Sequence, residues 1–434
     1  MLRQMQTPTA PGRTPGASDA DAGNTGRRSV LILVENLPSP FDRRVWQEAS
    51  ALRDAGYDVS IVCPTGRGYE RRFEIIDDVH IHRYRLPVEA SGALGYALEY
   101  AAALSWSFML SLRVAFTRGF DVIHACNPPD LFVFIGALFK PFGRKFLFDH
   151  HDLNPELYEA KFGRRDWLYR LMLKLEYLTF RVADVSIATN ESYRRVAIER
   201  GRMAPERVFV VRSGPSLERL GILPPDEKLR CGRRFLVGYV GVMGQQEGIH
   251  YLLEAARHIV FGLGRTDIHF GLVGGGTALQ DMKALAVRLD VDQYVTFTGR
   301  VPDAEMLAML NTADVCVNPD VANEMNDKST MNKIMEYMAL GKPIVQFDLT
   351  EGRYSAQQAS LYARRNDPLD LGEKIVELLD DPERRARMGA FGRRRVENEL
   401  EWRHEIPKLL AAYAALWDRG VAPGSVVRST ETRS

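Results

Sequence analysis

The sequence contains few cysteines, and no two of them are spaced for a shared role. Only four occur among 434 residues, at Cys63, Cys126, Cys231 and Cys316. No pair has the spacing of a metal-ligand or redox motif. This scarcity argues against a disulfide-stabilised secreted protein and favours a reduced, cytoplasmic one.

Neither sign of charge predominates, and long apolar runs are missing. Lys and Arg number 57 against 56 Asp and Glu. Without a basic excess there is no general case for binding a nucleic-acid backbone. The most apolar window, residues 100–112, is shorter than the ~20 residues that span a bilayer. We therefore predict no membrane span and interpret this window as a buried helix.

Short apolar runs alternate with helical patterns on both sides of a poorly patterned segment. The run at 29–34 and the helical pattern at 43–55 begin the first alternation. Such βαβ units build parallel sheets. A chain of this length usually folds into two large domains. We predict an α/β fold with two doubly wound, Rossmann-like domains and a cleft between them. The expected parts are a disordered tail at 1–27, a first domain at 28–214, a linker at 215–234, a second domain at 235–398, a terminal helix at 399–420 that packs on the first domain, and a disordered tail at 421–434.

Two glycine-bearing turns follow predicted strands of the second domain, but neither is a dinucleotide fingerprint or a P-loop. One turn holds Gly274, Gly275 and Gly276, and the other holds Gly241 and Gly244. Glycine lets a ligand approach the backbone closely. A tight strand–helix turn without a ligand is the alternative.

Residues 326–345 read as a polar loop, a short amphipathic helix, a glycine stop and a buried strand. Ser329 and Thr330 are predicted to cap the helix, whose free first-turn N–H groups form a ready phosphate site. Glu336, two turns further on, is placed to hydrogen-bond a ribose. An ordinary amphipathic helix with a solvated Glu336 is the alternative.

Charged residues follow two predicted strands of the first domain. Asp149, His150, His151 and Asp152 come directly after an apolar run at 145–148. A histidine beside carboxylates can act as a general base or contact a sugar hydroxyl. A metal site is the weaker interpretation, since no third ligand completes a pattern.

Two further features of the first domain leave alternatives open. Arg43 and Arg44 oppose the dipole at a predicted helix start, which suggests an anionic ligand, although a surface ion pair is the commoner outcome. The Phe-rich stretch 131–148 carries interleaved Lys and Arg. We favour core packing for it, with attachment to an anionic membrane surface as the alternative.

Several segments together resemble a known family. Residues 336–345 (EYMALGKPIV) are similar to the signature E-A-M-A-x-G-x-P-V-V of the family-four, group 1 retaining glycosyltransferases. Residues 272–276, 295–301 and 313–319 also match, as do His151 and Asp152. The resemblance extends from residue 29 to about residue 417 and implies the two-domain GT-B architecture.

The resemblance also implies an activity and a set of site residues. It implies transfer of a hexose from a UDP- or GDP-sugar to a glycan or lipid-linked acceptor, for surface polysaccharide or glycolipid synthesis. Configuration would be retained, with no cofactor and no required metal, and the protein would be cytoplasmic, with peripheral membrane association as a further option. Catalytic roles would fall on His151, Asp152 and Lys328. Donor contacts would come from Arg43, Arg44, Gly241, Gly244, Gly275, Arg300, Asp327, Ser329, Thr330, Met331, Asn332, Lys333 and Glu336.

Three positions depart from the family pattern. Lys328 replaces a glutamate, Val242 an arginine and Glu247 a lysine. The missing basic pair normally neutralises the donor diphosphate, and an uncompensated dianion in a closed cleft is costly. The candidates to replace that charge are Arg43, Arg44, Lys328 and Lys333. A non-catalytic sugar-nucleotide-binding relative and a sugar-nucleotide 2-epimerase remain the alternatives.

Overall fold

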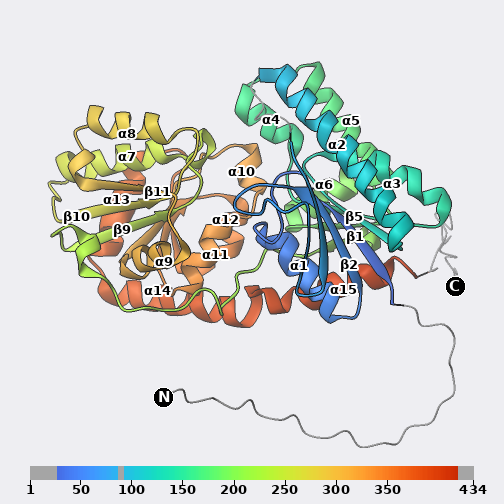
Figure 1. Cartoon of the computed structure of the whole chain (residues 1–434). Helices are drawn as coiled ribbons and strands as arrows, with labels where there is room; N and C mark the ends of the chain where they lie inside the picture. Colours follow the sequence, from blue (N-terminus) through green and yellow to red (C-terminus); the bar gives the residue numbers. More distant parts are fainter. Residues whose placement is uncertain (1–26, 87–91, 419–434) are drawn as a thin grey trace, which may run out of the picture.

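The structure, a computed structural model, describes residues 27–86 and 92–418. Over these residues the chain forms two α/β halves that lie side by side, each built around one sheet (Figure 1). The predicted tails at 1–27 and 421–434 lie outside the described residues, apart from Arg27.

The first half is organised around an eight-stranded sheet of order β3-β4-β2-β1-β5-β6-β7-β8. Neighbouring strands are parallel except for β3, which pairs antiparallel with β4 at the edge. The sequence analysis missed β3, because its side chains are half-exposed and its apolar run is very short. The strands are β1 (Ser29–Leu33), β2 (Asp58–Pro64), β3 (Phe73–Ile76), β4 (Val79–Tyr84), β5 (Val122–Cys126), β6 (Lys145–His150), β7 (Val185–Ala188) and β8 (Val208–Val210).

Helices cover both faces of this sheet. The helices are α1 (Arg43–Asp54), α2 (Gly92–Thr117), α3 (Val133–Phe139), α4 (Asn154–Phe162), α5 (Trp167–Val182) and α6 (Glu191–Glu199). Side chains of α2, α3 and the end of α5 pack in one apolar cluster, whereas α1 packs in another on the opposite face. The prediction of a buried helix at 100–112 is wrong in part. Only the inner face of α2 is buried, and within this window Trp106 is 39% and Met109 is 48% exposed.

The second half has a six-stranded parallel sheet of order β11-β10-β9-β12-β13-β14. Its strands are β9 (Phe235–Val240), β10 (Ile268–Val273), β11 (Val295–Gly299), β12 (Val315–Asn318), β13 (Ile344–Phe347) and β14 (Ser360–Ala363). Its helices are α7 (Ile249–Arg257), α8 (Leu279–Arg288), α9 (Asp303–Thr312), α10 (Glu324–Lys328), α11 (Asn332–Ala339), α12 (Thr350–Ala356), α13 (Pro368–Leu379) and α14 (Pro382–Arg395). Two doubly wound halves confirm the predicted α/β fold class.

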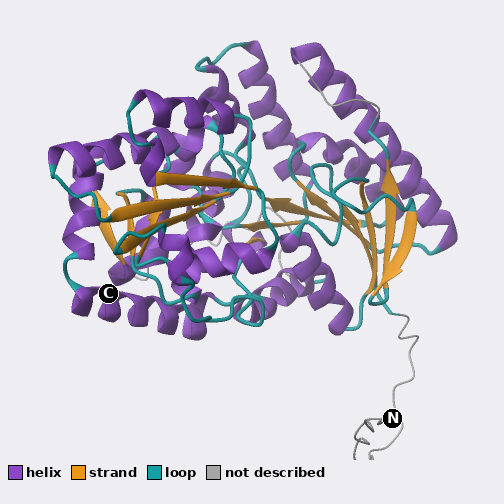
Figure 2. Ribbon diagram, turned by 60° about the vertical axis from the view of Figure 1, so that its left-hand side comes forward, coloured by secondary structure: helices purple, strands orange, loops and turns teal. Residues whose placement is uncertain are grey.

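The chain crosses between the halves twice. After α14 it runs through a π-helical turn, Val396–Leu400, into α15 (Ile406–Ala415), which lies under the first half (Figure 1). Figure 2 shows the two sheets as separate groups of strands, each flanked by helices. Leu409 and Tyr413 of α15 are fully buried in the α1 side of the first core. The two crossings touch each other, since the Trp402 N–H donates to the Pro215 carbonyl at 3.1 Å.

Candidate functional site

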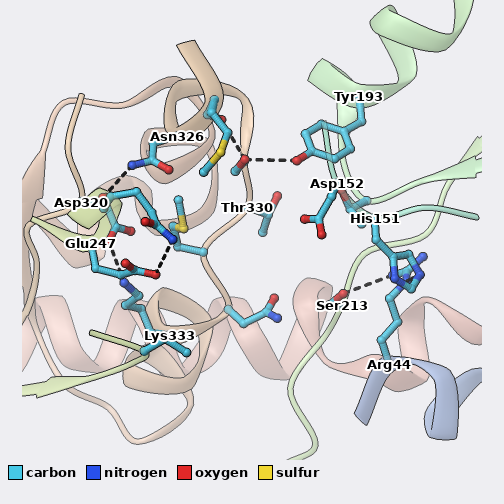
Figure 3. Close-up of a pocket in the computed structure, with 17 residues that line it drawn as sticks. Arg44, His151, Asp152, Tyr193, Ser213, Glu247, Asp320, Asn326, Thr330 and Lys333 are labelled. Carbon is cyan, nitrogen blue, oxygen red and sulfur yellow. Dashed lines mark hydrogen bonds and ion pairs between the residues drawn. The ribbon is translucent and has the colours of Figure 1, made fainter. Parts of the chain in front are cut away.

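A cavity of about 390 Å³ lies between the two halves, at the carboxyl ends of their strands. Figure 3 shows His151, Asp152 and Arg44 on one side of it and Lys333, Asp320 and Glu247 on the other. The residues that line the cavity are Arg44, His151, Asp152, Thr189, Tyr193, Ser213, Val242, Gln246, Glu247, Asp320, Met325, Asn326, Ser329, Thr330, Met331, Asn332 and Lys333.

The amino end of α11 faces this cavity, but Ser329 and Thr330 do not cap it as predicted. The helix begins at Asn332, and Met331 is its N-cap residue, without a side-chain hydrogen bond. Ser329 Oγ instead donates to the Met325 carbonyl at 2.7 Å, which closes the preceding short helix α10. The first-turn N–H groups of α11 are therefore left without a side-chain cap, and such groups favour an anion.

The first-half wall is formed by the residues that follow β6. The backbone N–H groups of His151 and Asp152 both donate to Asn127 Oδ1, at 2.6 and 3.1 Å. Burial raises the pKa of the Asp152 carboxyl. The His151 ring contacts Arg44 Nε at 3.0 Å through its own Nε2. Two backbone bonds and the contacts of the His151 ring with Arg44 and Asp149 thus hold this pair at the cavity.

A buried ionic network lies directly behind His151. Arg44 Nη2 is 2.8 Å from Asp149 Oδ1 and 3.0 Å from Glu48 Oε1, and both carboxylates are fully buried. Burial alone would raise the pKa of Asp149, but the charges of Arg44 and His151 outweigh it and hold the pKa well below its usual value. For Glu48, burial prevails over Arg44 and raises the pKa well above its usual value. The network therefore combines an ionised Asp149 with a Glu48 that resists ionisation.

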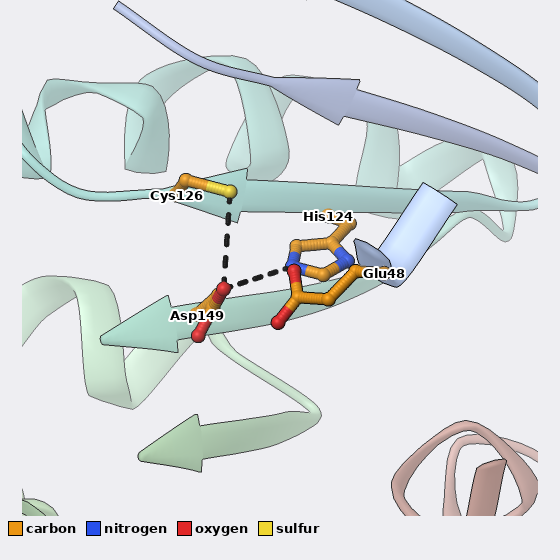
Figure 4. A group of neighbouring side chains, drawn as sticks. All are labelled: Glu48, His124, Cys126 and Asp149. Atoms are coloured by element: carbon orange, nitrogen blue, oxygen red, sulfur yellow. Dashed lines mark hydrogen bonds and ion pairs between the residues drawn. The ribbon is translucent and has the colours of Figure 1, made fainter. Parts of the chain in front are cut away.

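The same network contains a group of side chains with metal-ligand chemistry. Glu48, His124, Cys126 and Asp149 place their ligand atoms within 4.8 Å of one another (Figure 4). Arg44, however, already contacts both carboxylates of this group. The guanidinium thus balances the charge that a metal ion would otherwise balance.

A second buried ion pair lies across the cavity. Lys333 Nζ is 2.7 Å from Asp320 Oδ1 and lies 5.0 Å from the centroid of the Tyr239 ring. Burial lowers the pKa of Lys333, but Asp320, Tyr239 and Glu247 together raise it by more, so the ammonium stays charged. Burial also raises the pKa of Asp320 and of Glu247.

Glu336, Arg43 and Arg300 lie at the boundary between the halves but do not line the cavity. Glu336 Oε1 accepts from Arg43 Nη1 at 3.3 Å and also contacts Arg219. Arg300 lies over the ring of Phe41, 4.7 Å from its centroid. The carboxylate expected to hold a ribose therefore contacts two arginines, Arg43 of the first half and Arg219 of the segment that crosses between the halves.

Lys328 and Asp327 also lie outside the cavity wall. Lys328 Nζ is 2.8 Å from Glu324 and 3.5 Å from Glu156 of the first half. Asp327 accepts from Arg365 at 2.7 Å. The structure thus gives both residues ion pairs that bind elements together, and it does not bring them to His151 and Asp152.

The predicted donor-site glycines pack loops against each other. A Cβ at Gly274 would lie 1.8 Å from the Gly241 carbonyl oxygen, and one at Gly244 would lie 2.7 Å from Glu247 Oε2. Gly241, Gly244 and Gly275 are absent from the cavity wall, whereas Val242 is part of it. The close approach that these glycines permit is therefore mainly between loops.

Sequence reasoning missed the polar contacts that join the halves at the cavity rim. Asn190 Nδ2, just before α6, donates to Thr330 Oγ1 at 3.0 Å, and Tyr193 OH lies 3.1 Å from Ser329 Oγ. Ser192 Oγ donates to Glu351 at 2.6 Å. The one available signal was that these residues follow a buried strand, β7, where ligand-facing residues collect in such folds.

Comparisons with known proteins match both halves. A family model described as "Glycosyl transferase 4-like domain" matches residues 42–214, and one described as "Glycosyl transferases group 1" matches residues 234–381. The chain is 28% identical over 188 residues to a GDP-mannose-dependent monoacylated alpha-(1-6)-phosphatidylinositol monomannoside mannosyltransferase of Corynebacterium glutamicum, covering 43% of this chain and 46% of that protein. It is 26% identical over 247 residues to the 2-deoxystreptamine glucosyltransferase of Streptomyces kanamyceticus, covering 54% and 60%. The matched segments thus span about half the length of these relatives.

Solved structures show the same fold. The chain is similar to the sucrose-phosphate synthase of Thermosynechococcus elongatus, with a TM-score of 0.75 at 19% identity over 90% of this chain and 99% of that one. It is also similar to Anabaena HepE in complex with UDP-glucose, with a TM-score of 0.66 at 15% identity over 89% and 99%. At these identities the likeness concerns the arrangement of the two halves.

Proposed function

Since the chain belongs to the group 1 glycosyltransferases, we propose that it transfers a hexose from a nucleotide-diphosphate sugar to a glycan or lipid-linked acceptor. The C. glutamicum relative is named for GDP-mannose and a lipid, and HepE was solved with UDP-glucose. UDP- and GDP-sugars are accordingly the donors to test. A lipid-linked acceptor would place the enzyme at the cytoplasmic face of a membrane as a peripheral protein. No helix within residues 27–86 and 92–418 is long and apolar enough to cross a bilayer.

The observation that carries the proposal is the cavity into which one strand end and one helix start project. His151 and Asp152 enter it from the first half, and the uncapped start of α11, with Asn332 and Lys333, enters it from the second. In the proposed complex the diphosphate lies against the first turn of α11, and the transferred sugar lies between it and His151. Charge developing on the leaving diphosphate would then be stabilised by helix N–H groups and by Lys333.

In the proposed reaction the configuration of the sugar is retained and no metal takes part, as the family resemblance implies. The leaving diphosphate would help deprotonate the acceptor hydroxyl on the same face of the sugar. Of the four candidates for the missing positive charge, Arg44 and Lys333 line the cavity, whereas Arg43 and Lys328 do not. We therefore assign the charge compensation to Arg44 and Lys333.

A thermal-shift panel of UDP- and GDP-sugars tests donor binding. A ligand at 100 times its Kd stabilises the folded chain by about 2.7 kcal/mol, which raises the melting temperature. Because a hydrogen bond to a charged group is worth roughly 1.5–3 kcal/mol, we expect Lys333→Gln to weaken donor binding about tenfold or more. Lys328→Gln is the matched control and should leave binding unchanged. If Lys328→Gln weakened donor binding more than Lys333→Gln did, that result would contradict the placement of the diphosphate.

Product analysis separates the proposed transferase from its alternatives. A non-catalytic binding protein gains support from one observation: Arg44 and Lys333 are each already paired with a buried carboxylate. Such a protein would bind donor without releasing nucleotide. A 2-epimerase would convert the donor sugar without any acceptor. Transfer to an acceptor, with the anomeric configuration read by NMR, supports the proposal, and inversion would refute the proposed geometry.

A further inference from the structure

Exposed apolar side chains gather on one outer surface of the first half. More than half of the large apolar side chains exposed within the described residues lie between residues 98 and 178. On α2 they are Leu98, Trp106, Met109 and Phe116, spaced so that they share one helix face. Soluble monomeric proteins seldom collect exposed apolar side chains in one place unless something binds there.

Two further helices extend this surface. α5 exposes Trp167, which is 72% accessible, together with Leu171 and Leu178. Phe134 of α3 and Phe142 just beyond it are 49% and 72% exposed. α2, α3 and α5 lie on the same outer side of the first half (Figure 1). We call the exposed residues of these three helices and of the turn after α3 the α2–α5 face.

Basic side chains predominate over acidic ones on the α2–α5 face. On α5 the exposed apolar residues alternate with the exposed basic residues Arg170, Lys174 and Arg181. Arg113 is exposed near the end of α2, whereas Arg118, just beyond it, is paired with Asp58. The carboxylates of α2 and α5 are less accessible, since Glu99 and Asp166 are half-buried and the carboxylate of Glu176 is buried against Arg200. A surface that combines aromatic and aliphatic side chains with an excess of exposed Lys and Arg is typical of attachment to anionic lipid.

The α2–α5 face also adjoins the cavity. The β6–α4–α5 segment runs from His151 and Asp152 to Trp167. Beside Trp167, Arg165 Nη2 pairs with Glu324 of α10 at 3.0 Å, and the next two residues of α10, Met325 and Asn326, line the cavity. An acceptor held in a membrane against this face would therefore lie next to the opening between the halves.

We infer that the α2–α5 face docks on an anionic bilayer and that the acceptor is consequently lipid-anchored. The part of this inference that concerns the acceptor rests on the proposed function. A second copy of the chain is the weaker occupant, because two faces with an excess of exposed basic residues repel each other. Apolar side chains would enter the interfacial region, and the basic residues would contact lipid phosphates and carboxylates.

Co-sedimentation of the full chain with vesicles tests the docking. We expect binding to mixed phosphatidylcholine–phosphatidylglycerol vesicles that weakens with salt, and little binding to phosphatidylcholine alone. Each basic residue near an anionic surface is worth roughly a fivefold change in affinity, so Arg170→Glu with Lys174→Glu should weaken binding at least about twentyfold. Phe116→Ser with Trp167→Ser should weaken it as well, and both pairs should leave thermal unfolding without lipid unchanged, since these side chains are exposed.

The matched control is the pair Lys283→Glu and Val287→Ser on the exposed side of α8 in the second half, where Val287 is 64% exposed. These substitutions should leave vesicle binding unchanged. No sedimentation, equal sedimentation with neutral and anionic vesicles, or equal loss in the control would overturn the inference. Dimerisation abolished by the α5 substitutions would overturn it too, because the face would then be a self-association surface.

Donor binding, measured by thermal shift without vesicles, keeps the two proposals distinguishable. A chain that binds a sugar nucleotide but no vesicles refutes the docking and leaves the proposed function standing. A chain that binds anionic vesicles but no sugar nucleotide supports the docking and refutes the proposed function. Transfer that is faster onto a vesicle-embedded acceptor than onto its soluble head group, and that loses this advantage in Arg170→Glu with Lys174→Glu, supports the lipid-anchored acceptor. Equal rates on both would refute it.

Discussion

At the scale of single residues, Asp149 joins the core of the first half to the cavity. Its carboxylate is fully buried, accepts from Arg44 Nη2 at 2.8 Å and contacts the ring of His151. Removing one partner of a buried ion pair typically costs about 3–5 kcal/mol. We expect Asp149→Asn to lower the free energy of unfolding by about 3 kcal/mol or more at neutral pH, measured by denaturant titration.

The pH dependence of this loss follows from the depressed pKa of Asp149. A carboxylate with a lower pKa in the folded state stabilises the fold above its unfolded pKa, about 4, and loses that contribution as the pH falls further. The gap between the parent chain and Asp149→Asn should therefore narrow below about pH 4. Asp58, which forms a more exposed pair with Arg118, supplies the control. Asp58→Asn should cost about 1 kcal/mol or less, and an equal cost at both sites would contradict the account.

For Glu48 we predict the opposite dependence of stability on pH. Burial raises its pKa in the folded state, so the folded chain retains a proton that the unfolded chain releases above about pH 4. This group therefore destabilises the fold progressively as the pH rises from about 4 toward its folded pKa. Glu48→Gln cannot titrate, and its stability relative to the parent should rise with pH by about 1.4 kcal/mol per unit of pKa shift. Exposed Glu373→Gln should show no such trend. A constant difference from pH 4 to 8 would show that Glu48 ionises normally.

At the scale of elements, the turn after β10 shows which glycines serve packing. Gly274 has φ of +133°, and a Cβ there would lie 1.8 Å from the Gly241 carbonyl oxygen, whereas the nearest atom to a Cβ at Gly275 lies at 3.8 Å. We expect Gly274→Ala to destabilise the chain by about 2 kcal/mol or more, because a strained φ alone costs roughly 1–3 kcal/mol. Gly275→Ala should be nearly neutral in the same thermal denaturation. If Gly275→Ala lost donor affinity while its stability stayed unchanged, Gly275 would be a donor contact after all.

Elements that are buried on both faces could be predicted from the sequence, because a parallel strand in that position reads as a continuous apolar run. β1 and β10 are such strands. β3 is an edge strand with half its side chains exposed, so it gave no such run. The start of α11 was misplaced for another reason. Ser329 has the chemistry of a cap, but its hydroxyl bonds back to Met325 instead, and spacing alone does not distinguish these uses.

The sequence predicts the candidate site correctly where residues able to contact a ligand directly follow a strand. His151 and Asp152 follow β6 directly, and the structure places both on the cavity wall. The contacts of Arg44 with Asp149 and of Lys333 with Asp320 were not predictable, because each joins residues from different elements. Glu336 was expected to face a ribose, but the two arginines that it contacts come from the first half and from the crossing segment.

At the scale of the whole molecule, the first half is completed by the C-terminal end of the chain. Trp402, Leu409, Tyr413 and Leu416 belong to its buried core, and Tyr413 OH lies 2.8 Å from Nδ1 of the fully buried His124. The core of the first half is therefore assembled from two separate segments of the chain, whereas the core of the second half comes from one uninterrupted segment, 220–400. This arrangement ties the buried network behind His151 to a helix that follows the second half in the sequence.

A chain ending at Glu401 tests this dependence. Burying a large apolar side chain contributes about 1.5–3 kcal/mol, so losing four of them removes an amount comparable to the 5–15 kcal/mol that stabilises a typical domain. We expect the shortened chain to lose the cooperative unfolding of the first half, seen as rapid proteolysis within residues 28–214 and a missing calorimetric transition. A chain ending at Asp418 keeps α15 and should unfold like the parent. An unchanged transition in the shorter chain would show that the first half folds without α15, and the link between the C-terminal helix and the site would then be refuted.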